Sequence, residues 1–135
     1  METIRCFIGV ELTDDLKRSL SLLQQGSDCG KGVRWVPPDN IHITLRFLGQ
    51  IRPERIAAAG AAFETAVCGF KKLRIQVSGV GAFPTPNNPK VLWAGLKENR
   101  ELQEIHAALS DRLSDAGFAK EKRPFSPHLT LARVR

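Results

Sequence analysis

Two histidines stand in the same short pattern in two separate parts of the chain. Residues 42–45 read His-Ile-Thr-Leu and residues 128–131 read His-Leu-Thr-Leu, and the chain holds three histidines in all. One His-x-Thr segment in a strand is usually part of a solvated polar face. Two copies that use two of the three histidines instead indicate two strands that build one site.

These residue types suit the cleavage of a phosphodiester. The reaction needs one group that removes a proton from the nucleophile and another that delivers a proton to the leaving oxygen. Histidine titrates close enough to neutral pH to do either. Threonine hydroxyls can donate hydrogen bonds to the charged phosphoryl oxygens. His42 and His128 are therefore the candidate catalytic residues, with Thr44 and Thr130 as candidate phosphate ligands and no need for a metal ion.

Both patterns fit β-strands, in which alternate side chains share a face. Each histidine then points the same way as its threonine, while the aliphatic neighbours point into the core. Arg46 lies an even number of residues after His42 and shares its face, either as a substrate contact or as a solvated cation at the strand end. Arg133 lies an odd number after His128, so the strand must end, bend or bulge for this arginine to reach the site.

Hydrophobic periodicity predicts the elements that support these two strands. Alternating or β-favouring stretches predict strands at residues 3–11, 33–36, 41–47, 72–80, 90–96 and 127–134, and apolar residues at helical spacing predict helices at 13–25, 53–67 and 99–117. Thr13 and Asn99 have side chains that cap helix N-termini. Glycine- and proline-rich segments predict loops at 26–32 and 81–89.

Several of the predicted strands follow one another without a helix between them. This order favours an α+β fold with antiparallel pairing over a doubly wound parallel sheet. It also contains a coarse repeat, because each half of the chain has a helix ahead of a His-x-Thr-Leu strand. No linker or low-complexity segment divides residues 1–135, which we expect to form a single domain.

The composition is that of an ordinary globular protein with an excess of positive charge. Hydrophobic residues make up 42% of the chain, and no stretch of about 18 apolar residues predicts a membrane helix. Twenty Lys and Arg residues against 14 Asp and Glu residues give a formal net charge of +6, which favours anionic partners such as nucleic acid. The N-terminal residues lack the pattern of a secretory signal, so we expect a cytoplasmic protein.

Cysteine usage gives no sign of a disulfide framework or a metal site. The three cysteines, Cys6, Cys29 and Cys68, are odd in number and show no ligand spacing. The histidines form neither of the common zinc patterns, so we expect thiols and no metal.

The motifs and their surroundings resemble a known family. The segments that carry the resemblance are HITLRFLG at 42–49, PFSPHLTLAR at 124–133, Arg5-Cys6-Phe7, Trp35-Val36, and a Gly-x-Phe-Pro loop with a Leu-Trp strand within 79–96. Together they resemble the two-histidine phosphoesterase superfamily, and most closely the bacterial and archaeal RNA 2′,3′-cyclic phosphodiesterases, also called 2′–5′ RNA ligase-like proteins. The resemblance covers nearly the whole chain.

For the fold, the resemblance implies a bilobal α+β protein. Two antiparallel-rich sheets would carry helices packed outside, and a central cleft would hold the two His-x-Thr motifs. Members of the family usually continue past the second motif with a further strand-rich segment. Because this chain stops at Arg135, we expect a two-lobed domain that lacks that segment.

For function, the resemblance implies hydrolysis of RNA 2′,3′-cyclic phosphate ends to a 2′-phosphate, with no metal. We also expect no cofactor, no membrane association and no obligate protein partner. By analogy His42 and Thr44 form one half of the site, and His128 and Thr130 form the other. Arg133 matches an arginine that the family often has after its second motif. We assign His128 to activating water and His42 to protonating the 3′ leaving oxygen, although the residues alone leave that assignment open.

Aromatic residues near the motifs have two interpretations. Phe7 and Phe83 are candidates for stacking on a nucleobase, with core packing as the alternative. Trp93 is expected to pack in the core. His106 lies in a predicted helix without a threonine partner and is expected at the surface or its boundary.

Three other functions remain compatible with the sequence. The chain could be a noncatalytic module that binds RNA or nucleotides, although pure binding does not need two titratable imidazoles. It could also be a 2′–5′ RNA ligase or a phosphodiesterase for small cyclic nucleotides. Product analysis separates hydrolysis from ligation, because hydrolysis leaves a terminal 2′-phosphate and ligation leaves an internal 2′–5′ bond.

Overall fold

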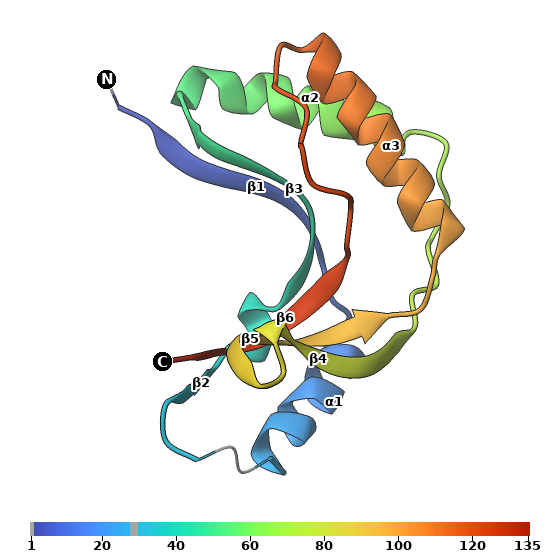
Figure 1. Cartoon of the computed structure of the whole chain (residues 1–135). Coiled ribbons are helices and arrows are strands. Elements are labelled where there is room, and N and C mark those ends of the chain that lie inside the picture. The colour runs from blue at the N-terminus through green and yellow to red at the C-terminus, as the bar shows by residue number, and fades with distance from the viewer. Residues whose placement is uncertain (1, 28–29) are drawn as a thin grey trace. The chain divides into compact units, whose positions relative to one another are not determined.

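The structure is a computed structural model that describes residues 2–27 and 30–135. In chain order the elements are β1 (Ile4–Glu11), α1 (Asp14–Gln25), β2 (Val33–Trp35), η1 (Pro38–Asn40), β3 (His42–Ile51), η2 (Pro53–Arg55), α2 (Ile56–Val67), β4 (Val77–Thr85), β5 (Asn88–Leu96), α3 (Arg100–Asp115) and β6 (His128–Val134) (Figure 1). The strands form two sheets, one of β1 and β3 and one in the order β2-β6-β5-β4. The predicted α+β fold with antiparallel pairing is confirmed.

The chain divides into two compact units. The first holds the chain up to Ile8, Thr44–Ile75 and Glu98–Ser126, and the second holds Gly9–Ile43, Gln76–Lys97 and Pro127–Arg135. The boundary falls inside β1 and inside β3. His42 therefore belongs to the second unit, with β6, and Thr44 to the first.

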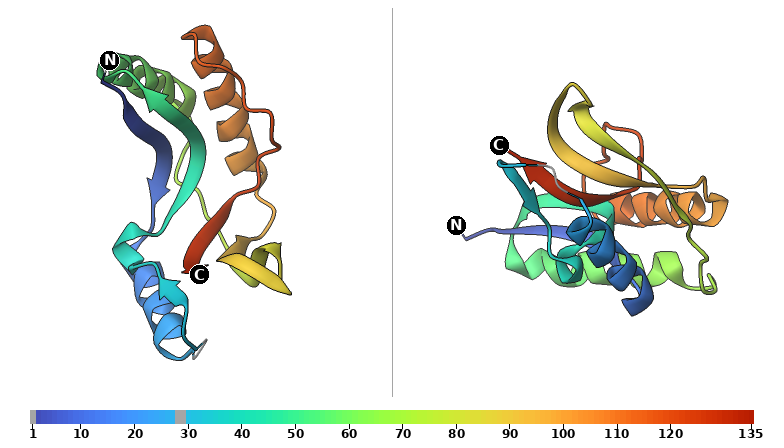
Figure 2. Two further views of the ribbon diagram at one scale, coloured as in Figure 1. Left: turned by 60° about the vertical axis from the view of Figure 1, so that its left-hand side comes forward. Right: turned by 90° about the horizontal axis from the view of Figure 1, so that it is seen from below.

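In the first unit, α2 and α3 lie side by side (Figure 2). The helix α2 buries only alanines on its inner side, which lets α3 approach closely. The helix α3 contributes larger side chains at helical spacing, namely Leu102, Ile105, Leu109 and Leu113, all at most 5% exposed. The Asn99 side chain accepts a hydrogen bond from the Leu102 amide at 2.9 Å, as predicted for an N-cap.

In the second unit, α1 and one side of the four-stranded sheet build the core. Leu20 of α1 is 4% exposed, and Leu129 and Ala132 of β6 are fully buried. Thr13 caps α1, because its hydroxyl accepts a hydrogen bond from the Leu16 amide. All neighbouring strands of this sheet are antiparallel.

The predicted strand at 72–80 is right only for its last four residues, and the predicted loop at 81–89 is wrong except for the turn between β4 and β5. The strand β4 begins at Val77 and continues to Thr85, where a tight turn leads into β5. Glycine and proline are used here for packing rather than for a loop. A Cβ on Gly81 would lie 2.2 Å from Cζ2 of Trp93, so only glycine lets the indole lie over β4. Pro84 and Pro89 face each other at an irregular end of the hairpin.

Candidate active site

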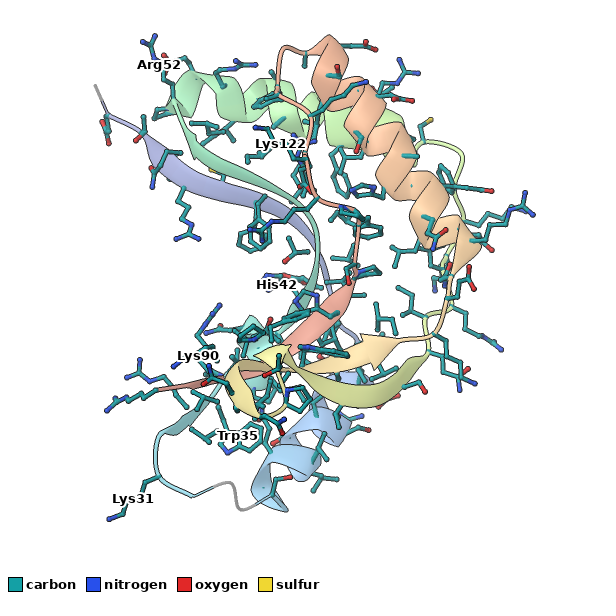
Figure 3. The ribbon with its side chains drawn as sticks, in the orientation of Figure 1. Lys31, Trp35, His42, Arg52, Lys90 and Lys122 are labelled. Atoms are coloured by element: carbon teal, nitrogen blue, oxygen red, sulfur yellow. The ribbon has the colours of Figure 1, made fainter. Side chains whose placement is uncertain are left out.

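The two motif strands repeat one pattern of burial. In β3, His42 and Thr44 are half-buried, while Ile43 and Leu45 are each 2% exposed. In β6 the corresponding His128 and Thr130 are half-buried, and their aliphatic neighbours are 0% and 4% exposed. The predicted alternation is thus confirmed in both strands. Figure 3 shows His42 at the start of β3.

A bulge in β6 changes which residues share the face of His128. The cross-strand partners are Gly95 with His128, Trp93 with Thr130 and Val91 with Arg133, and the register shifts by one residue between Leu92 and Trp93. Leu131 is the extra residue in β6. Because paired residues point to the same side of a sheet, His128, Thr130 and Arg133 all lie on one face. The odd offset that argued against Arg133 is removed by this bulge.

Gln24 holds the bulge from α1. The carbonyl oxygen of Leu131 accepts a hydrogen bond from the Val36 amide at 2.8 Å and another from Nε2 of Gln24 at 3.4 Å. The same Nε2 donates to the carbonyl oxygen of Val36 at 2.8 Å. Gln24 is 9% exposed, so its amide joins the end of β2 to the bulged position of β6 inside the protein.

Two aromatic rings flank His128. The Phe83 ring meets the imidazole edge-on, with centroids 5.2 Å apart and an interplanar angle of 79°. The Trp93 centroid is 6.5 Å away, and Phe83 and Trp93 also contact each other at 5.4 Å. Phe83 is 39% exposed. Trp93 was expected in the core, but it is half-buried beside the imidazole. The pairing of β5 with β6 places Trp93 opposite Thr130, next to His128, and the periodicity of the sequence does not contain this register.

Comparison with known proteins identifies the family. The family model described as LigT-like phosphoesterase matches residues 10–93 and 95–135. An RNA 2′,3′-cyclic phosphodiesterase of Archaeoglobus fulgidus is 34% identical over 98% of this chain and 73% of its own length. The chain belongs to the LigT-like phosphoesterase family.

A further relative and a solved structure support membership of this family. An RNA 2′,3′-cyclic phosphodiesterase of Thermotoga maritima is 31% identical over 98% of this chain and 71% of the relative. The crystal structure of TT0787 of Thermus thermophilus superposes with a TM-score of 0.86 at 27% identity, over 97% of this chain and 74% of that one. The expected family and the expectation of an enzyme are confirmed.

In this LigT-like phosphoesterase, Phe7 lies in the first unit on β1. Its ring is 47% exposed and pairs with Phe47 of β3, with centroids 6.3 Å apart. Phe47 was not singled out from the sequence. The strands β3 and β6 have the same burial pattern from their motif histidines onward, and Phe47 in β3 corresponds to Arg133 in β6. Comparing the two strands residue by residue beyond the shared tetrapeptide would have indicated it.

Arg46 is not a solvated cation at the strand end. It is 5% exposed, its Nε lies 3.0 Å from Oε1 of Glu121, and it donates a hydrogen bond to the carbonyl oxygen of Ala119. The alternation of burial breaks at Leu45 and Arg46, which are both buried. Arg46 therefore anchors the segment between α3 and β6. A regular strand would place Arg46 on the same face as His42, but the burial of β3 does not alternate regularly at this point.

His106 is more enclosed than expected of a helix-surface residue. Its ring stacks on Phe125, with centroids 3.9 Å apart and an interplanar angle of 3°. Burial lowers the pKa of His106 below its ordinary value of 6.5; the charge of Glu121 raises it and that of Arg46 lowers it, both to a smaller extent. The folded protein therefore favours the neutral imidazole.

This burial predicts a pH dependence of stability. A histidine whose pKa is lower in the folded state contributes stability that is present above its unfolded pKa. That contribution is lost as the pH falls through 6.5 toward the folded value. We expect the free energy of unfolding of wild type to decline relative to that of His106→Phe as the pH is lowered from about 7.5 to about 5.5. Urea titrations measure it, and a difference that does not change with pH would refute the expectation.

The described cysteines and potential ligands show no metal grouping. Cys6 and Cys68 are free thiols, and Cys29 lies outside the described residues. Within residues 2–27 and 30–135 no three His, Cys, Asp or Glu side chains are close enough to hold one ion. None of the helices in those ranges has the length and apolar character of a membrane span.

Proposed function

We propose that this LigT-like phosphoesterase hydrolyses RNA ends that carry a 2′,3′-cyclic phosphate and leaves a 2′-phosphate. The observation that carries the proposal is the repeated strand. Each copy presents an imidazole and a hydroxyl on its half-buried side, and the copy in β6 adds an arginine. Relatives that are 34% and 31% identical over 98% of the chain bear the name of this activity.

The proposed reaction needs two proton transfers, and two histidines supply them. His128 takes a proton from water while the water oxygen attacks phosphorus. The bond from phosphorus to O3′ breaks, and His42 delivers a proton to O3′. The products are a 2′-phosphate and a free 3′-hydroxyl, so no metal, cofactor or second substrate besides water is consumed.

The remaining residues would stabilise the charge of the phosphoryl oxygens and contact the terminal nucleobase. Thr44 and Thr130 donate hydrogen bonds to the phosphoryl oxygens, and Arg133 offsets the negative charge that grows on them during attack. Phe83, exposed beside His128, offers an aromatic face to the terminal base, and Phe7, exposed on β1 in the first unit, is a second candidate aromatic contact for RNA. Such stacking tolerates any base, so we propose little preference for the 3′-terminal nucleotide.

The test is turnover of a short RNA with a 2′,3′-cyclic phosphate end in the presence of EDTA. We expect a product heavier by one water, with the phosphate on the 2′-oxygen by ³¹P NMR. Adding an RNA with a 5′-hydroxyl tests ligation, which would leave an internal 2′–5′ bond instead. No turnover by a protein that circular dichroism shows to be folded would overturn the proposal.

A further inference from the structure

The four-stranded sheet of the second unit has an unusual charge balance. Its strands carry three formally charged residues, Arg34 on β2, Lys90 on β5 and Arg133 on β6, and all three are cationic and exposed. The figure labels Lys90 near the tip of the β4–β5 hairpin (Figure 3). No carboxylate lies in these strands, and the register places Arg34 and Arg133 on one face, which therefore offers two cations to an anion.

Arg34 and Arg133 occupy directly opposed positions. They are Cα partners in the antiparallel pair of β2 and β6, so their side chains leave the sheet on the same side. Within the described parts of the chain no ion pair involves either guanidinium. Like charges directly opposite each other destabilise a sheet. The pair therefore costs stability that an anion bound between or beside the two groups would recover.

The pair continues the face of the second motif. Because Arg133 shares the face of His128 and Thr130, Arg34 lies on that face as well, one strand further out. The aromatic residues Phe83 and Trp93 lie on the opposite flank of β6, on β4 and β5. The face thus runs from aromatic rings through the imidazole and hydroxyl to two arginines. This order matches a nucleotide whose base lies at one end and whose phosphate backbone leaves at the other.

We propose that Arg34 binds the internucleotide phosphate that precedes the cyclic phosphate, so that the preferred substrate is an oligonucleotide rather than a mononucleoside cyclic phosphate. This rests on the proposed function for its chemistry. Arginine is suited to the contact, because its planar group makes two parallel hydrogen bonds to phosphate. Arg133 serves the cyclic phosphate, and Arg34, on the edge strand, serves the next one.

Binding tests the proposal independently of turnover. The probe is a fluorescent hexanucleotide with a 2′-phosphate end, titrated at several salt concentrations. For single strands, each phosphate contact adds about 0.7 to the slope of log affinity against log salt. We expect Arg34→Gln to lower that slope by about 0.7 and Arg34→Lys to restore most of it. Arg18→Gln is the matched control, because Arg18 is an exposed arginine of the same unit that pairs with Asp15 on α1.

Turnover gives the second measurement. We expect kcat/KM for a dinucleotide with a cyclic phosphate end to exceed that for the mononucleoside cyclic phosphate by about 10-fold, as one charged hydrogen bond allows. Arg34→Gln should abolish this preference and leave mononucleoside hydrolysis within about twofold of wild type. An unchanged salt slope, or an equal loss on both substrates, would overturn the role of Arg34.

The two failures can be told apart. If wild type hydrolyses neither substrate, the proposed function fails, and the salt slopes still decide whether Arg34 contacts RNA. If wild type hydrolyses both substrates equally well and Arg34→Gln binds like wild type, the function stands and the inference about Arg34 is wrong. Native circular-dichroism spectra and cooperative melting of all three variants show that each one folds, and Arg34→Gln should melt no lower than wild type because it removes one of two opposed cations.

Discussion

Replacing either motif histidine by alanine should slow hydrolysis of the cyclic phosphate by about 100-fold or more, the loss expected when a general acid or base is removed. Both His42→Ala and His128→Ala should keep the fold, because both side chains are half-buried and point away from the aliphatic core. His106→Ala is the matched control, because His106 is the one other histidine of the chain and lies in the first unit, whereas His42 and His128 lie in the second. A loss of similar size in all three variants would show that the effect is structural.

The pH dependence of these variants assigns the two roles. A general base must be neutral, so its titration lowers the rate at low pH, whereas a general acid must be protonated and its titration lowers the rate at high pH. A wild-type rate profile that declines at low and at high pH, in two limbs, would show both requirements. We expect the residual activity of His128→Ala to lose the low-pH limb and that of His42→Ala to lose the high-pH limb. The reverse result would exchange their roles.

The sequence predicted those features of the candidate site that depend on local patterns. His42 with Thr44 and His128 with Thr130 alternate with aliphatic residues, and that alternation fixes their half-buried position in any antiparallel sheet. Helix caps at Thr13 and Asn99 are equally local, and the structure has both. Each of these features is determined by residues that are close together in the sequence.

The positions that the sequence did not predict depend on contacts between residues far apart in the chain. Arg46 is buried because Glu121, far along the chain, pairs with it. Gly81 lies in β4 and pairs with Trp93, whose indole occupies the space where a side chain would be, so this glycine serves cross-strand packing and not a loop. The bulge that turns Arg133 toward the face of His128 is contacted from α1, where Nε2 of Gln24 donates to the carbonyl oxygen of Leu131. Each of these is a tertiary contact that overrides a local preference.

The alignment of Arg133 with His128 should therefore depend on a residue in another element. Arg133→Gln should lower kcat/KM by about 100-fold, because in the proposed reaction it removes the donor that offsets the charge developing on the phosphoryl oxygens. Gln24→Met keeps the shape of the side chain but removes both donors, so the Val36 carbonyl loses its Gln24 donor and the Leu131 carbonyl loses one of two. The bulge then relaxes, and Arg133 loses its position.

A double-mutant cycle separates this effect from general destabilisation. We expect Gln24→Met to lower kcat/KM by about 10-fold in wild type, yet by less than about twofold when Arg133 is already glutamine. Gln25→Met is the control, because the neighbouring Gln25 is exposed and donates only to Ser21 within α1. Equal losses in both backgrounds would mean that Gln24 supports the fold without orienting Arg133. A loss confined to the background with Arg133 would show that one buried amide in α1 sets the geometry of the phosphate site.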